Sequence, residues 1–278
     1  MNLKSVLSIL AITLTLGLPA CAGNADKDGA KAKGAIKQIE PVEQMYNRAA
    51  RALDQNNYNV AADGFDEVEQ QYPYSQWATR AQLMSAYAHY RDMKYDNAIM
   101  GLDRFIQLHP GNENIAYAYY LRALGFYEQI SDVRRDQRMT QLALEGLRQV
   151  AERFPNTHYA RDAQLKIDLT LDHLAGKEME IGRYYLTRDQ YQAAINRFQK
   201  VVDDYQTTTH IPEALHRLTE AYLALGIPSE AKKATAVLGH NYPDSRWYED
   251  SYSLITGKKV QSAPDNRTVY EKTLGRIF

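Results

Sequence analysis

The side chains that most often do chemistry are few and scattered in this sequence. The chain has seven histidines, and the closest pair, His210 and His216, lacks the four-residue spacing of a zinc-binding helix. The segment Thr256–Lys259 contains Gly-Lys but has neither the upstream glycine nor the following Ser or Thr of a phosphate-binding loop. The paired carboxylates Asp203 and Asp204 follow a predicted helix end, where solvated charge is their ordinary role. We therefore expect no enzyme activity, no metal site and no cofactor.

The single cysteine, Cys21, has a position that indicates covalent modification. Residues 1–20 continue from a short charged start into an apolar stretch over residues 5–18, which is too short to span a bilayer and typical of a signal-peptide core. Leu18-Pro19-Ala20-Cys21 resembles the bacterial lipobox. In lipoproteins of this type the cysteine becomes the mature N-terminus and carries acyl chains, whose buried methylenes each contribute about 0.8 kcal/mol to anchoring. The alternative is ordinary secretion with cleavage at Ala20.

Residues 21–42 are predicted to be the lipidated N-terminus and a flexible tether. They are mostly Ala, Gly, Lys and Asp without apolar periodicity, and a chain of this kind and length reaches on the order of 25 Å from the bilayer. Ala22 follows the cysteine instead of the aspartate that retains enterobacterial lipoproteins at the inner membrane. We therefore expect the protein to be lipid-anchored at the outer membrane.

The composition describes a folded binding protein. Of 278 residues 45% are apolar, and 33 Lys and Arg balance 34 Asp and Glu, which leaves a formal net charge of −1. No net basic field exists to hold nucleic acid. The 21 tyrosines far outnumber the 6 phenylalanines, which favours rings that are buried with one end in water, as on helices that line a groove.

A pattern with helical spacing recurs along the chain. An aromatic or turn residue is followed by Ala three residues later, by apolar residues near seven and ten, and by an aromatic residue or His at fourteen, usually with Pro next. These offsets define one face of a helix that ends just before its Pro. The instances begin at Tyr58, Tyr95, Thr140, Tyr191 and Pro228. A second helical run precedes each and holds a mostly small residue, where the partner helix can approach closely: Ala49, Ala86, Gly125, Gly182 or Thr219.

This pattern resembles five tetratricopeptide repeats, so we expect an all-α superhelical solenoid. We assign residues 43–158 to N-terminal repeats 1–3, residues 159–248 to C-terminal repeats 4–5, and residues 249–278 to a partly disordered tail. The insert Ile130–Arg138 lengthens the loop inside the third repeat. Its charges form either a solvated face or a partner contact, and the sequence leaves both open.

The lipobox, tether and repeats together are similar to one family, the BamD outer-membrane assembly lipoproteins. The resemblance covers about residues 43–248 and is carried by segments such as Asp103-Arg-Phe-Ile-Gln-Leu-His-Pro110, Ala116-Tyr-Ala-Tyr-Tyr-Leu-Arg122 and Ala194-Ile-Asn-Arg-Phe198. It implies a non-enzymatic, periplasm-facing member of the BAM complex, which folds β-barrel proteins into the outer membrane, with BamA and other BAM lipoproteins as partners. In the family the C-terminal repeats hold the POTRA region of BamA. Arg197 falls in the matching helix, off the core and free to pair with a carboxylate.

The resemblance also places recognition of unfolded barrel proteins in the N-terminal repeats, at C-terminal segments that are rich in aromatics and end in a carboxylate. Offsets from each Pro put an aromatic strip with arginines at its edges on the concave side, where rings take apolar side chains and a guanidinium pairs the carboxylate. The residues predicted for this peptide-binding groove are Arg80, Tyr87, Tyr90, Arg91, Tyr119, Arg122 and Phe126, with Tyr46 and Leu83 beside them. The alternative function is a periplasm-facing repeat lipoprotein that scaffolds peptidoglycan or division proteins.

Overall fold

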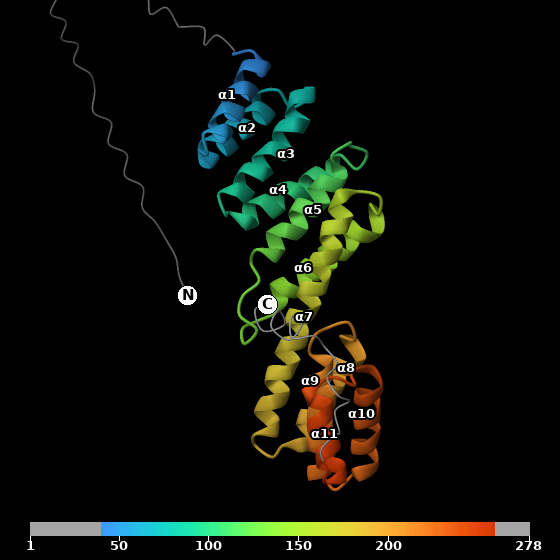
Figure 1. Ribbon diagram of the computed structural model, residues 1–278. Coiled ribbons are helices and arrows are strands. Elements are labelled where there is room, and N and C mark those ends of the chain that lie inside the picture. The colour runs from blue at the N-terminus through green and yellow to red at the C-terminus, as the bar shows by residue number, and fades with distance from the viewer. Residues whose placement is uncertain (1–39, 259–278) are drawn as a thin grey trace, which may run out of the picture. The chain divides into compact units, whose positions relative to one another are not determined.

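The computed structural model describes residues 40–258, and every regular element in this range is a helix (Figure 1). The helices are α1 (Val42–Asp54), α2 (Tyr58–Gln71), α3 (Gln76–Arg91), α4 (Tyr95–Leu108), α5 (Ile115–Tyr127), α6 (Arg138–Arg153), α7 (His158–Leu186), α8 (Tyr191–Asp204), α9 (Ile211–Ala224), α10 (Pro228–Asn241) and α11 (Arg246–Thr256). The first ten form five consecutive pairs that pack on their neighbours in the sequence. The predicted all-α fold with five tetratricopeptide-type helix pairs is confirmed for the described residues.

The turn inside four of the five pairs has one backbone conformation. Asn56, Met93, Asp189 and Gly226 adopt φ values of 60°, 58°, 58° and 75°, each two residues before the second helix of its pair begins. The next amide closes the turn on a carbonyl five residues back, as the amide of Lys94 does at 2.9 Å. The α5–α6 pair differs because the insert stands in place of this turn.

The second helix of each pair ends where the repeat pattern predicts. The residue after each helix has an extended φ between −127° and −137°: Tyr72, His109, Phe154, Tyr205 and Tyr242. All but Tyr205 precede a proline, which disfavours the helical conformation in the residue before it. Ser75 and Thr157 then cap the helices that follow, because their hydroxyls accept hydrogen bonds from backbone amides at 3.1 and 3.2 Å.

Small residues set the spacing between helices, as the sequence predicts at Ala49, Ala86 and Gly182. In the third pair the prediction of Gly125 is wrong, because a Cβ atom added to Gly146 of α6 would lie 3.0 Å from the Cβ of Ala123, whereas one added to Gly125 would meet Ile99 of α4. A Cβ atom added to Gly64 would lie 3.0 Å from the Cβ of Ala49, and one added to Gly101 would lie 3.2 Å from that of Ala86. At Gly182 of α7 the added atom would lie 2.4 Å from the ring of Phe198 on α8. A larger side chain at any of these positions would force the helix pair apart.

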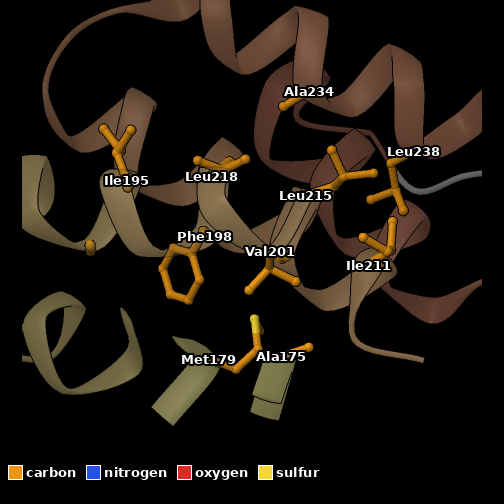
Figure 2. Packing of buried hydrophobic residues seen from close by; sticks show 13 residues of the cluster. Ala175, Met179, Ile195, Phe198, Val201, Ile211, Leu215, Leu218, Ala234 and Leu238 are labelled. Atoms are coloured by element: carbon orange, nitrogen blue, oxygen red, sulfur yellow. The ribbon is translucent and has the colours of Figure 1, made fainter. Parts of the chain in front are cut away.

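Helix α7 is longer than the repeat pattern predicts, with 29 residues against 11 to 16 in the other helices. Its part up to Leu174 contributes Ala163, Ile167 and Leu174 to a core cluster shared with α5 and α6. Its second half contributes Ala175 and Met179 to the cluster of α8, α9 and α10, part of which Figure 2 shows. The boundary assigned between residues 158 and 159 therefore lies at the start of a helix that both groups of pairs share.

Helix α11 begins before residue 249, so the first part of the segment assigned to the tail is helical through Thr256. The ring of Trp247 lies 5.1 Å from that of His216 on α9. The Oγ atom of Ser251, which is fully buried, lies 2.8 Å from His216 Nδ1. These contacts dock α11 on the last pair. The remainder of the tail from residue 259, together with the signal peptide, Cys21 and most of the tether, lies outside the described residues.

Candidate peptide-binding surface and partner contacts

The best-connected of the predicted groove residues is Arg91, at the end of α3. Its Nη1 donates to the hydroxyl of Tyr87 at 2.8 Å and its Nη2 donates to the hydroxyl of Tyr58 at 2.7 Å. The guanidinium also lies 4.9 Å from the ring centroid of Tyr58 and 5.7 Å from that of Tyr87, which is a cation–π arrangement. Arg91 thus joins the first helix of the second pair to the start of α2.

Further rings continue from α5 to α7. The rings of Tyr117 and Tyr120 lie 5.5 and 5.2 Å from that of Tyr159 on α7, and the hydroxyl of Tyr120 donates to Asp162. Burial raises the pKa of Tyr117, and so do the neighbouring tyrosines of α3 and α7. The rings of three first helices, α3, α5 and α7, and of Tyr58 at the start of α2 therefore form one set. We call this set the tyrosine surface: Tyr58, Tyr87, Tyr90, Arg91, Tyr117, Tyr120, Tyr159 and Asp162.

The pKa values of Tyr90, Tyr117 and Tyr120 are raised, so these three hydroxyls stay protonated at neutral pH. Burial raises the pKa of Tyr90 to about 12. The charge of Glu128, which accepts a hydrogen bond from the Tyr90 hydroxyl at 3.3 Å, acts in the same direction. Burial would raise the pKa of Asp162, but hydrogen bonds from Lys166, at 2.8 Å, and from Tyr120 outweigh it, so this pKa is lowered. The surface thus combines aromatic faces and phenolic groups with one guanidinium and one ionised carboxylate. Such a surface suits an extended polypeptide with apolar side chains.

Two leucines continue this apolar area along α7. Leu165 is 66% exposed and Leu169 is 60% exposed. They stand three and seven residues after Asp162, so helical geometry puts all three on one side of α7. Two large apolar side chains left in solvent beside a group of rings extend the area available to a bound segment.

Three predicted groove residues lie on another side of α5. Tyr119 is 9% exposed, and its ring lies 5.5 Å from that of Phe154 in the cluster with α6. Arg122 donates to Asp103 on α4 at 2.9 Å and to Gln149 on α6 at 3.2 Å. Phe126 shares their side by its spacing of seven and four residues from them. The proline offsets therefore gave the wrong register for α5, because Tyr119, Arg122 and Phe126 do not join the tyrosine surface.

Arg80 is exposed and stands apart from the tyrosine surface. Its guanidinium lies 5.8 Å from the ring of Trp77, at a hollow of about 410 Å³ that Tyr46 and Leu83 also line. Arg80 shares one side of α3 with Arg91 but lies roughly 16 Å from it along the helix axis. An extended segment several residues long is needed to contact both arginines.

Sequence reasoning missed Tyr58, Tyr117, Tyr120 and Tyr159. A signal existed for two of them, because Tyr117 and Tyr120 are three residues apart and so share one side of a helix. The other two stand at or near helix starts, Tyr58 at the first residue of α2 and Tyr159 at the second residue of α7. Only the packing of four successive pairs brings those positions to one surface.

Arg197 of α8 lies off the core as predicted, but it is not free. Its Nη1 donates to Glu178 Oε2 at 3.0 Å, and Lys200 Nζ donates to Glu178 Oε1 at 2.8 Å. Glu178 is 8% exposed, so two cations compensate one buried carboxylate. The side chain of Arg197 remains 39% exposed. A partner's carboxylate would therefore share this guanidinium with Glu178.

Neither a metal cluster nor a membrane-spanning helix is found between residues 40 and 258. Within this range no three His, Cys, Asp or Glu side chains are grouped so as to hold a metal ion. None of the helices there combines the length and the apolar character that a membrane crossing requires.

The fold and the tyrosine surface define the class: a tetratricopeptide-repeat protein whose first helices present an aromatic surface suited to polypeptide. Residues 38–238 match the family model YfiO, described as outer membrane lipoprotein.

Three relatives are each named outer membrane protein assembly factor BamD. The chain is 48% identical over 260 residues to that of Caulobacter vibrioides, covering 94% of this chain and 84% of the relative. It is 46% identical over 256 residues to that of Rickettsia prowazekii, covering 92% and 98%. It is 36% identical over 249 residues to that of Neisseria meningitidis serogroup A, covering 85% and 91%. The chain belongs to the BamD family.

Proposed function

We propose that this chain is a non-enzymatic outer-membrane protein assembly factor, anchored by acyl chains on Cys21 with its repeats in the periplasm. Membership in the BamD family supports the assembly role. The lipobox Leu18–Cys21 supports the anchor, because several acyl chains on one residue hold a protein to a bilayer effectively permanently.

The tyrosine surface is the proposed site for unfolded outer-membrane proteins, which bind through their aromatic-rich C-terminal segments. Two groups of contacts carry this proposal: Arg91 bonds Tyr87 and Tyr58, and Tyr117 and Tyr120 pack on Tyr159. The groups adjoin at Tyr117, on whose pKa Tyr87, Tyr90 and Arg91 act. Tyrosine faces take apolar side chains while their hydroxyls stay hydrated. Arg91 is exposed, and its guanidinium supplies the charge that a terminal carboxylate requires.

The test is binding of a labelled synthetic peptide from the C-terminus of a barrel protein to the Cys21→Ala chain, measured by fluorescence anisotropy. Arg91→Glu is expected to weaken binding by about 1.5–3 kcal/mol, the range for a hydrogen bond to a charged group, and amidation of the peptide should reproduce much of that loss. Tyr159→Ala should also weaken binding. The matched control is Tyr184→Ala, since Tyr184 is a 53% exposed tyrosine on the other half of α7. Equal affinity of Arg91→Glu and wild type would refute the site.

BamA is the proposed principal partner, with its POTRA region on the C-terminal repeats near Arg197 and with other BAM lipoproteins in the same assembly. Arg197→Glu removes the guanidinium offered to BamA, so it should reduce recovery of BamA from detergent-solubilised outer membranes. The same change also places a second carboxylate beside buried Glu178. Glu178→Gln in the same chain removes that repulsion without restoring the guanidinium. If the double variant recovers BamA fully, the loss came from strain at Glu178, and Arg197 is not a contact.

A further inference from the structure

The insert between α5 and α6 is an ordered loop, held by two side chains. Gln137 is 8% exposed, and its Nε2 donates to the carbonyl oxygens of Asp132, Val133 and Arg135 at 3.2, 3.4 and 3.1 Å. Lys177 of α7 donates from Nζ to the carbonyl oxygens of Arg134 and Arg135 at 2.9 and 3.3 Å. Loop carbonyls that water would otherwise solvate are thus bonded to side chains, which fixes the loop on the middle of α7.

The fixed loop presents two arginines that do little for the fold. Arg134 is 78% exposed at its side chain, and its Nε is 3.8 Å from Glu180, a long ion pair that is worth little at a surface. Arg135 is exposed, and among residues 40–258 it has no ion-pair partner within 4.0 Å. The loop therefore positions two guanidinium groups whose donors remain available.

Both arginines line a hollow of about 440 Å³ where the loop, the start of α6, the middle of α7 and the end of α8 meet. Two more cations line it, Lys177 and Lys200, against two carboxylates, Asp136 and Glu178. Because Arg197 also pairs with Glu178, the hollow keeps an excess of positive charge. Leu174, Ile181 and Tyr205 supply apolar lining between the charges.

We infer that this hollow binds an acidic segment of a protein partner, with Arg134 and Arg135 pairing its carboxylates. Guanidinium groups match carboxylates with two parallel hydrogen bonds, and the apolar lining suits the stems of Asp and Glu side chains. The lining carboxylates disfavour a lipid phosphate, which has no apolar stem to place between them. This site is distinct from the tyrosine surface, because it uses the second half of α7 and the outer helices α6 and α8.

The experiment uses the full chain with Cys21→Ala and fluorescein-labelled hexaglutamate as the probe, with anisotropy read at low and at physiological salt. Arg134→Glu with Arg135→Glu should weaken binding at least tenfold at low salt, and the difference should shrink as salt screens it. The matched control is Lys232→Glu with Lys233→Glu on α10, which changes the net charge equally at two exposed lysines. This control should bind within twofold of wild type.

Gln137→Ala tests the positioning of the loop without changing charge. It should weaken hexaglutamate binding several-fold while circular dichroism shows the helices intact. The inference is overturned if wild type fails to bind at low salt, if the Lys232 and Lys233 control loses as much as the arginine variant, or if Gln137→Ala binds as wild type. It is also overturned if the arginine pair is needed for binding phosphatidylglycerol vesicles, or for self-association in sedimentation, but not for binding hexaglutamate.

Discussion

Gly182→Ala tests the close contact between α7 and α8 most directly. The new Cβ would lie 2.4 Å from Phe198 Cε1 and 2.8 Å from both Cδ1 and Cζ, whereas carbon atoms pack at about 3.5–4.0 Å. The ring must therefore move by about 1 Å. Phe198 is fully buried, and Figure 2 shows it beside Val201 and Met179, so no free space receives it.

The expected free-energy change is the difference between two effects. Overpacking a close-packed core costs about 1–3 kcal/mol, and replacing glycine by alanine inside a helix contributes about 1 kcal/mol of stability. The net expectation is a loss of about 1 kcal/mol, which lowers Tm by about 2–4 °C for a protein of this size. The assay is thermal unfolding of the Cys21→Ala chain followed by helical circular dichroism.

A double-mutant cycle with Phe198→Leu identifies the cause. The smaller side chain leaves room for the new methyl group. The double variant should therefore lose less free energy of unfolding than the two single variants together, by at least about 0.5 kcal/mol. Gly111→Ala is the control, because a Cβ atom there meets nothing within 4 Å, and it should leave Tm unchanged. A rise in Tm for Gly182→Ala, or strict additivity in the cycle, would refute the reasoning.

Three further predictions concern the anchor, the tyrosine surface and a turn. Cys21→Ala should move the protein from the outer-membrane fraction to the soluble or precursor fraction in cell fractionation, and wild type that is already soluble would contradict the anchor. Burial raises the pKa of Tyr90 in the folded protein to about 12 against an ordinary 10.0. The protonated side chain therefore contributes its full stability below pH 10, and this contribution is lost as the pH rises toward 12. The phenolate absorbance of wild type, compared with that of Tyr90→Phe, measures the pKa of this hydroxyl. Met93→Gly should raise Tm by a few degrees, because Met93 is 74% exposed and has φ 58°. A non-glycine residue at this φ costs about 1–2 kcal/mol, and the greater loss of backbone entropy by glycine on folding offsets part of that gain. An unchanged or lower Tm would contradict this prediction.

The sequence was sufficient for the helix pairs because their signals are local. Pro73 and Pro155 mark helix ends directly, and Gly182 marks a close approach. The length of α7 was not predictable from such signals, since no proline interrupts residues 158–186 and nothing local shows where the partner helix changes. The register of α5 failed for a different reason. A one-residue error rotates a helix by about 100°, and the run from Ala116 to Arg122 carries rings on more than one side.

The side-chain partners of charged residues also lay beyond the sequence. Arg197 meets Glu178 across two helices, nineteen residues apart, and no spacing rule connects them. By contrast, the lipobox-like segment and the aromatic richness of the N-terminal repeats could be recognised from the sequence pattern. Which of the rings contact one another could not.

The core changes partners within α7 between Leu174, which packs toward α5 and α6, and Ala175, which packs toward α8 and α9. The backbone is one uninterrupted helix across that point, so neither half can turn about the axis of α7 without turning the other. Tyr159 and Asp162 therefore belong to the same continuous helix as the side chains that pack against α8. For the same reason the chain offers no clean cut between its halves. A fragment ending at residue 158 would lack α7 and would leave Leu147 and Val150 of α6 uncovered. Binding measured on such a fragment would therefore not describe the N-terminal repeats as they are in the whole chain.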